Sequence, residues 1–321
     1  MVRTKDNVLS TGTLRKGSST KLVKLWRNIR KNWLLYLFLL PALVYIIIFQ
    51  YAPLYGIQIA FRDFKAQLGI WNSPWVGMKH FETFFQSYQF KDLLYNTLSL
   101  SIYQLCATIP MPVILALILN YTTMPHLKKL AQSSTFAPHL ISVVVMCGML
   151  TTFSSSTGLF NIIIGLFGHE PISFLGNPSL YQTMYVFSTV WQRTGYNAVI
   201  YIAALSCVSE DLHEAAIVDG ASKLKRVWYI DIPSILPTMV ILIIMAVGNL
   251  MSIGFEKSFL LQNDLNLERS EIISTYVYKV GIQGAQYSLS TAIGLFNNII
   301  NFILLVIVNK ISKALSGSSL W

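Results

Sequence analysis

Charge is scarce in this sequence. Asp, Glu, Lys and Arg together make up only 12% of the 321 residues, whereas 54% are hydrophobic and the mean hydropathy is +0.53. Ordinary soluble domains contain about 25% charged residues, so the composition excludes that class. We expect a protein that is solvated largely by lipid.

The sequence also lacks the residues of several chemistries. No stretch matches the Gly-x-x-x-x-Gly-Lys-[Ser/Thr] loop that cradles nucleotide phosphates, so we expect no ATP hydrolysis by the chain itself. The pair His213-Glu214 begins a zinc-protease pattern, but Ile217 stands where the second His would be required. The other histidines are dispersed, and no nucleophile, base and acid form a defensible set. We predict that the chain is not an enzyme and binds no metal and no cofactor.

Long apolar runs are what the sequence has instead. A helix needs about 20 apolar residues to cross a bilayer, and buried helices of soluble proteins usually have only about 10 to 14 in a row. The long runs are Trp33 to Phe61, Leu93 to Pro125, Leu130 to Gly168 (with His139), Pro171 to Ser209 (with Arg193), Ile232 to Phe255 and Val280 to Asn309. We therefore predict an all-α, polytopic membrane protein with six transmembrane helices, at about 33–51, 93–119, 130–153, 181–207, 235–255 and 289–309.

Basic residues are unevenly distributed among these runs. If the N-terminus is cytoplasmic, sixteen of the 24 Lys and Arg residues fall in cytoplasmic segments, and the other eight are matched by eight acidic residues. Because Lys and Arg favour cytoplasmic loops, we predict a multi-pass plasma-membrane protein with both termini in the cytoplasm. Anionic lipid headgroups, rather than nucleic acid, are the expected partner of the excess charge.

The composition predicts two domains. Residues 1–32 are polar and basic, and we expect a cytoplasmic segment that includes a short amphipathic stretch at the membrane surface (Leu22, Val23, Leu25, Trp26 and Ile29). Residues 33–321 form the six-span domain. Within it, a long polar loop at 209–234 separates the fourth and fifth predicted spans.

This polar loop has the pattern of a helix, a turn and a second helix. Ser209 is a suitable N-cap, and two acidic residues follow it in the first turn, where they favour the positive end of a helix. Gly220 permits a left-handed backbone at the turn. We expect the second helix over about 221–229, with Pro233 near the entry to the fifth span. On its own the pattern indicates a solvated helical hairpin, and such a short helix suits a groove on another protein.

The same loop resembles the cytoplasmic signature of the permease subunits of type I ABC importers. That signature is Glu-Ala-Ala, three residues, Gly, nine residues and then Ile-x-Leu-Pro. The matching residues are Glu214, Ala215, Ala216, Gly220, Ile230 and Pro233, with Ile232 in place of the signature Leu. Further stretches resemble the LplB-type oligosaccharide permeases of the carbohydrate-uptake branch, at residues 54–61, 73–77, 254–257, 273–278 and 319–321.

The resemblance implies a role for the loop and a set of partners. The helix before Gly220 would dock into a cleft of a cytoplasmic ATPase and transmit its closure to the spans. The coupling residues would be Glu214, Ala215, Ala216, Asp219, Gly220, Ala221, Ile230 and Pro233. The implied assembly has a second, homologous permease subunit, two subunits that hydrolyse ATP with Mg, and an extracellular sugar-binding lipoprotein. It would import an oligosaccharide across a bacterial cell membrane by alternating access.

Polar residues within the fourth and fifth predicted spans are candidates for a sugar site, because such residues usually face a cavity or another helix. The resemblance implies a mid-membrane site between these two spans. The candidates are Trp191, Gln192, Arg193, Tyr196, Asn197, Asn249, Ser252 and Glu256, of which the last three fall near one face at helical spacing. Equally, Arg193 and Glu256 could pair with each other or with the partner subunit, and the two aromatic residues could serve packing.

Two other classes stay open on the sequence. An ion-coupled secondary sugar transporter is expected to show internal repeats or an acidic residue inside the membrane, and only Glu256 comes close. A membrane enzyme needs catalytic groups that converge at one membrane face. Neither class accounts for the spacing in the polar loop.

Overall fold

The computed structural model describes residues 26, 28, 30–317, 319 and 320. These residues are largely helical, and the β-type pairing among them is a single isolated bridge between Arg62 and Trp75, so the all-α prediction is confirmed. The chain divides into two units, residues 1–57 and 58–321. Most of the predicted segment 1–32, including four of the five amphipathic positions, lies outside the described residues, as does Trp321.

The described part of the first unit is one helical run. α2, Trp33–Ile46, continues into the π-helical turn η1, Ile47–Tyr51, and then into the 3-10 segment η2, Ala52–Phe61, within which the second unit begins. The run is apolar and long enough to cross a membrane.

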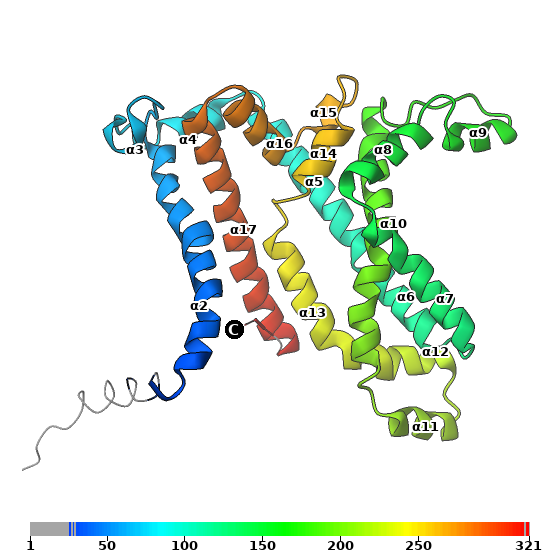
Figure 1. Cartoon of the computed structure of the whole chain (residues 1–321). Coiled ribbons are helices and arrows are strands. Elements are labelled where there is room, and N and C mark those ends of the chain that lie inside the picture. Colours follow the sequence, from blue (N-terminus) through cyan, green and yellow to red (C-terminus); the bar gives the residue numbers. More distant parts are fainter. Residues whose placement is uncertain (1–25, 27, 29, 318, 321) are drawn as a thin grey trace, which may run out of the picture. The chain divides into compact units, whose positions relative to one another are not determined.

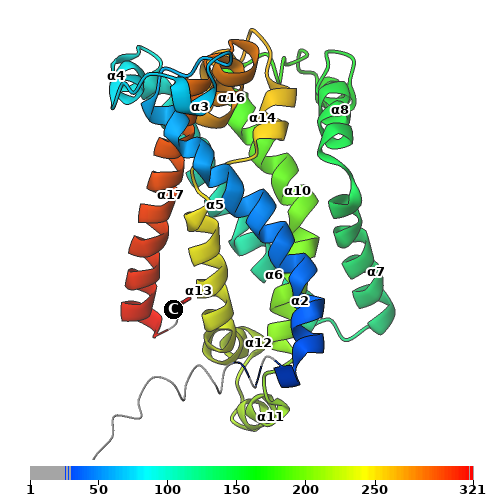
Figure 2. The same ribbon diagram turned by 60° about the vertical axis from the view of Figure 1, so that its left-hand side comes forward.

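The second unit is a bundle of long helices (Figures 1 and 2). α10, Pro178–Leu205, packs along α5, Phe90–Thr108, and α6, Pro110–Asn120. α13, Ile232–Gly248, packs against α17, Tyr287–Ser316. A bent segment lies beside α10, in which α7 (Pro125–Phe136) and η3 (Ala137–Leu140) meet α8 (Val143–Phe153) at 99°.

Short helices close the end of this bundle that is uppermost in Figure 1. They are α3 (Gly69–Asn72), α4 (Lys79–Gln86), α9 (Leu159–Leu166), α14 (Phe255–Leu261), α15 (Leu267–Ser270), α16 (Ile273–Tyr278) and the π-helical η5 (Lys279–Gln283). Aromatic rings attach α4 to the bundle, since buried Phe84 meets Phe90 and Phe296 edge to face, with centroids 5.1 and 5.7 Å apart. The opposite, lower end has α11 (Glu210–Val218), α12 (Lys223–Arg226) and the end of α17.

Length and apolar composition identify four helices of the described chain as able to cross a membrane, or five if the bent segment is one crossing. α10 is 28 residues long but is not among them. Its buried face includes the polar residues Ser188, Thr189 and Gln192, which lower its hydropathy. The predicted number of six crossings therefore stays a prediction.

The fifth predicted span differs from the observed helix at both ends. Helix is continuous over Lys223–Gly248, because the π-helical segment η4, Val227–Asp231, joins α12 to α13. In η4 the Ile232 N–H bonds to the Val227 carbonyl, and this wider turn accommodates Pro233, which has no N–H of its own. The hairpin's second arm is thus part of the same helix as the fifth span, rather than a separate helix over 221–229.

At its other end this helix stops at Gly248, seven residues before the predicted boundary at 255. The chain is non-helical from Asn249 to Gly254, and α14 follows. Asn301 of α17 accepts the Met251 N–H at 2.8 Å, so a side chain from another helix satisfies the backbone at the break. Such partners are what permit non-helical backbone inside a membrane protein.

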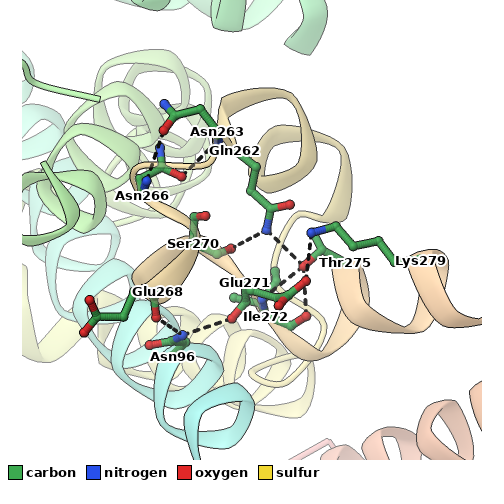
Figure 3. Close-up of polar contacts among 10 residues, drawn as sticks. All are labelled: Asn96, Gln262, Asn263, Asn266, Glu268, Ser270, Glu271, Ile272, Thr275 and Lys279. Carbon is green, nitrogen blue, oxygen red and sulfur yellow. Dashed lines mark hydrogen bonds and ion pairs between the residues drawn. The ribbon is translucent and has the colours of Figure 1, made fainter. Parts of the chain in front are cut away.

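Buried amides hold the upper loops in place (Figure 3). Asn96 of α5 is only 2% exposed, and its Nδ2 donates to the carbonyls of Glu268 and Glu271 at 2.8 and 3.1 Å. Nearby, Gln262 Nε2 donates to the Ser270 carbonyl at 2.9 Å. The segment between α14 and α16 is therefore fixed to α5 by side chains rather than by a sheet or a disulfide.

We expect Asn96→Leu to lower the free energy of unfolding by about 2 kcal/mol, because two backbone carbonyls lose the hydrogen bonds that they accept from a buried amide. Thermal unfolding of the detergent-solubilised protein measures the change. Asn72→Leu is the matched control, since Asn72 is exposed. Equal stability of the two variants would contradict the assigned role of Asn96.

Candidate functional site: a coupling hairpin and an intramembrane cavity

The predicted helix-turn-helix is present at the lower end of the bundle (Figures 1 and 2). α11 begins after Ser209, whose Oγ accepts a hydrogen bond from the Asp211 N–H at 3.3 Å. The chain reverses at Gly220, which has a φ of +74°. Both local predictions, the N-cap and the left-handed turn, are confirmed, and both follow from chemistry confined to a few neighbouring residues.

α11 turns one narrow face toward the rest of the protein. His213 and Ala216, three residues apart, are half-buried, and every other residue of the helix is exposed, including the predicted coupling residues Glu214 and Ala215. Val218 is 86% exposed. Leu212 and Ile217 are also exposed, and several exposed apolar side chains on one short helix are typical of a surface that contacts another protein.

The remaining predicted coupling residues divide between the turn and the second arm. Asp219 and Gly220 are exposed and Ala221 is half-buried at the turn. Half-buried Ile230 and exposed Pro233 belong to the long helix that continues into the bundle. The signature residues therefore lie on two elements, the outward-facing α11 and the first part of the long helix 223–248.

A buried carboxylate connects α11 to the bundle. Asp231 has no exposed surface and lies at the end of η4. Its Oδ2 accepts a 2.6 Å hydrogen bond from the hydroxyl of Tyr121, which follows α6, and its Oδ1 lies 3.3 Å from Nε2 of His213 in α11. The Arg226 guanidinium lies 5.5 Å from the centroid of the Tyr121 ring. We call these four residues the Asp231 cluster.

The Asp231 cluster keeps its hydrogen-bond direction at physiological pH. Burial, followed by the hydrogen bond to Asp231, raises the pKa of Tyr121 to about 12, so the hydroxyl retains its proton and donates. The sequence prediction missed this cluster. The sequence feature that could have indicated the cluster is Asp231 itself. It is an acidic residue at the x position of the Ile-x-Leu-Pro pattern, which the signature leaves open.

A cavity of about 600 Å³ lies between α5, α10, the end of α13 and α14. Six of the eight candidate sugar-site residues line it, namely Gln192, Arg193, Asn197, Asn249, Ser252 and Glu256. The prediction that the last three share a helical face is wrong, because Asn249 and Ser252 lie in the break after Gly248 and Glu256 lies on α14. The break nevertheless brings all three to the same cavity.

The other two candidates do not line this cavity. Tyr196 stacks on His139, with centroids 3.9 Å apart and ring planes at 14°. Trp191 is 45% exposed. The stacked pair joins α10 to η3, so packing is the role that the structure supports for Tyr196.

Several cavity residues already have partners within the chain. Gln192 is 8% exposed, and its Nε2 donates to the Ile141 carbonyl at the bend before α8. Asn249 donates to the Met245 carbonyl and so caps α13, and Ser252 accepts from Asn301. These side chains shape the cavity wall as well as facing the space inside it.

The suggested pair between Arg193 and Glu256 is absent, since no ion pair within 4.0 Å joins them in the described structure. Two cavity residues were missed in the sequence. Lys257 is 7% exposed, and Gln104 has a buried Oε1 with no hydrogen-bond partner, an acceptor that suits a sugar hydroxyl. Within the described part of the chain, no three His, Cys, Asp or Glu side chains gather as metal ligands.

Comparison with known proteins gives a consistent family. Residues 90–317 match the family model of the binding-protein-dependent transport system inner membrane component. Protein LplB of Bacillus subtilis (strain 168) is 39% identical, over 91% of this chain and 92% of its own. The polygalacturonan/rhamnogalacturonan transport system permease protein YteP of the same organism is also 39% identical, over 87% of each chain.

A solved structure agrees with these relatives. A chain of the bacterial alginate ABC transporter, in complex with an alginate pentasaccharide-bound periplasmic protein, superposes with a TM-score of 0.86 at 35% identity, over 92% of this chain and 100% of that chain. The resemblance to ABC importer permeases is thereby confirmed. The chain belongs to the family of binding-protein-dependent transport system inner membrane components.

Proposed function

We propose that this chain is one of two channel-forming subunits of an ATP-driven importer that moves oligosaccharides from an external binding protein into the cytoplasm. The observation that carries the proposal is the hairpin at 209–233, whose first helix exposes nearly all of its surface at one end of the bundle. The relatives described above supply the substrate class. Alternating access of the cavity between α10 and α14 would move the sugar.

The proposed orientation places the lower end of the second unit in the cytoplasm. The elements at that end are rich in Lys and Arg, with the first residues of α7, α12 and the last turns of α17 carrying Lys128, Lys129, Lys223, Lys225, Arg226, Lys310 and Lys313. Positive charge of this kind favours the cytoplasmic side. A cytoplasmic hairpin is then accessible to an ATPase, while the short helices of the upper end meet the binding protein.

The proposed partners divide the work. Two cytoplasmic ATPase subunits bind and hydrolyse ATP with Mg, and a homologous membrane subunit completes the channel. The exposed residues of α11, from Glu214 to Val218, and the turn at Gly220 form the surface that the ATPase grips. Closure of the ATPase would move α11 and, through the long helix 223–248, the wall of the cavity.

Val218→Asp tests whether the exposed surface of α11 binds the ATPase. Because Val218 is 86% exposed, the change should leave the fold intact while placing a charge in the apolar contact, and we expect about tenfold weaker retention of the ATPase. Uptake into vesicles that contain the cognate subunits should fall in parallel. Copurification of the ATPase and ATP-dependent uptake of labelled oligosaccharide measure the two effects.

Leu166→Asp is the matched control, since Leu166 is 82% exposed and lies on α9 at the opposite end of the bundle. It should retain the ATPase fully. Retention by Val218→Asp as strong as by Leu166→Asp would overturn the docking role of α11. Uptake that continues without any ATPase would instead favour an ion-coupled secondary sugar transporter.

A further inference from the structure

Lys257 is an unusual cation because it is buried without a carboxylate partner. It is 7% exposed, and no Asp or Glu oxygen lies within 4.0 Å of its Nζ in the described structure. Nζ donates to the Tyr185 carbonyl at 2.9 Å and to Thr189 Oγ1 at 2.6 Å. It also lies 4.5 Å from the centroid of the Tyr185 ring. Dipoles and a ring face hold the amino group, and no carboxylate of the described residues forms an ion pair with it.

The Lys257 amino group has a hydrogen-bond donor left for a ligand. An ammonium group carries three N–H donors, and two of those of Lys257 are used. Buried charges in proteins are normally paired, because removing an ion from water is costly unless an opposite charge is near. Lys257 forms part of the cavity wall, so a ligand in the cavity can supply that opposite charge.

A second cation lines the same cavity. Arg193 is exposed and has no ion-pair partner within 4.0 Å in the part of the chain described. Tyr185, Thr189 and Arg193 follow one another on α10 at intervals of four residues and therefore share one face of that helix. Two of them hold Lys257, and the third is Arg193 itself. The guanidinium presents a planar fork that suits a carboxylate.

The charge balance of the cavity is positive. Its lining residues with formally charged side chains are Arg193, Lys257 and Glu256, so the formal charges are two positive and one negative, an excess of one positive charge. The remaining lining is neutral, with amide and hydroxyl groups such as Gln104 and Asn197 that can hydrogen-bond to sugar. A positive field between low-dielectric walls concentrates anions over neutral molecules.

We propose that Lys257 and Arg193 make this cavity selective for oligosaccharides that carry carboxylate groups, with a sugar carboxylate lying against the free N–H of Lys257 and the guanidinium of Arg193. This inference rests on the proposed import function and adds the charge of the substrate to it. Lys257 is the specificity-determining residue, because no carboxylate among the described residues lies within ion-pair distance of its Nζ. Glu256 limits the excess charge, so that the anion is held without being trapped.

The test compares two sugars that differ only in charge. A uronic-acid trisaccharide and its carboxyl-reduced, neutral counterpart have the same length and linkages. The complete transporter with its binding protein is reconstituted in vesicles, and ATP-dependent uptake of both sugars is measured for the natural chain, for Lys257→Gln and for Lys91→Gln. Lys91 is an exposed residue of α5 outside the cavity, so it controls for the loss of one positive charge.

We expect Lys257→Gln to lower the preference for the acidic sugar by about tenfold, since a charge-assisted hydrogen bond becomes a neutral one, and Lys91→Gln to leave it unchanged. The binding protein's own preference cancels when each variant is compared with the natural chain. If uptake of the neutral sugar is below detection in every sample, the uptake rates of the acidic sugar by Lys257→Gln and by Lys91→Gln are compared instead. A lower rate for Lys257→Gln then supports the proposal, and equal rates contradict it.

Three results would overturn the proposal: an unchanged preference, equal loss of both sugars, or dependence of acidic uptake on anionic lipid but not on Lys257. Equal loss would mean that Lys257 only supports α10 packing. In each of these cases ATP-dependent uptake by the natural chain would leave the import function standing. Uptake that needs no ATP would remove the import function itself, whatever Lys257 does.

Discussion

Gly195→Ala should leave little folded protein. Gly195 is buried in the middle of α10, and a Cβ built there would lie 2.6 Å from the Phe136 N and still closer to the carbonyl group of Thr135. These are backbone atoms of α7, so no side-chain rotation relieves the overlap. Small residues permit such close approach of membrane helices. At Gly195 even the methyl group of alanine is too large for the space between α10 and α7.

The expected change in stability has the opposite sign from that of an ordinary Gly→Ala substitution in a helix. In an open helical site, replacing Gly with Ala stabilises a helix by about 1 kcal/mol. At Gly195 we expect instead a loss of about 3 kcal/mol or more, the upper range for overpacking, because α7 must move away from α10. The His139 and Tyr196 rings, which stack across this interface, would separate as well. The fraction of monodisperse protein in detergent and its thermal unfolding measure the loss.

Gly294→Ala is the control for this change. Gly294 lies within α17, and a Cβ there meets no atom within 4 Å. It should be neutral or slightly stabilising in the same measurements. If Gly195→Ala behaves like Gly294→Ala, α7 and α10 do not pack at the distance seen here.

The parts of the fold that the sequence predicted well depend on neighbouring residues. The hairpin is the clearest case, since Ser209 and Gly220 act within one turn of their own positions and the signature spacing is a property of one loop. The helical class likewise follows from apolar runs that are longer than any soluble core requires. For these features no distant contact is needed.

The parts that could not be predicted depend on residues far apart in the chain. The fifth span was extended to residue 255 because its composition stays apolar, but Asn301, fifty residues later, satisfies the Met251 N–H and permits the break. Lys257 was missed as a site residue, yet hydrogen bonds to Thr189 and Tyr185 hold it in the cavity wall. Tertiary contacts of this kind leave no periodic signal in a single sequence.

Asp231→Ala should uncouple ATP hydrolysis from uptake. α11 is joined to the bundle by its two chain connections and by the Asp231 cluster, and its own residues are at most half-buried. Without the carboxylate, Tyr121 loses the acceptor of its 2.6 Å hydrogen bond and His213 loses its neighbouring charge. Movement of α11 would then be absorbed at the Gly220 turn rather than passed to α13 and to the end of α6.

The expected result is a fall in sugar transported per ATP hydrolysed, on the order of 5- to 150-fold, the usual range of coupling between two sites. Hydrolysis and ATPase retention should persist, because the exposed surface of α11 is unchanged. Uptake and phosphate release are measured together in the same vesicles. Asp211→Ala is the matched control, since Asp211 is an exposed acid of the same helix outside the cluster.

Milder variants separate coupling from folding. Tyr121→Phe removes one hydrogen bond and keeps the ring beneath Arg226, so it should cause a smaller fall in the same ratio while the unfolding temperature changes little. Removing one partner of a buried pair is usually destabilising, so the unfolding temperature of Asp231→Ala is measured beside that of Tyr121→Phe. An unchanged ratio in Asp231→Ala would mean that the helix 223–248 alone transmits the motion. Loss of ATPase retention in both variants would mean that the cluster only supports the docking surface, because a coupling element must act after the ATPase has bound.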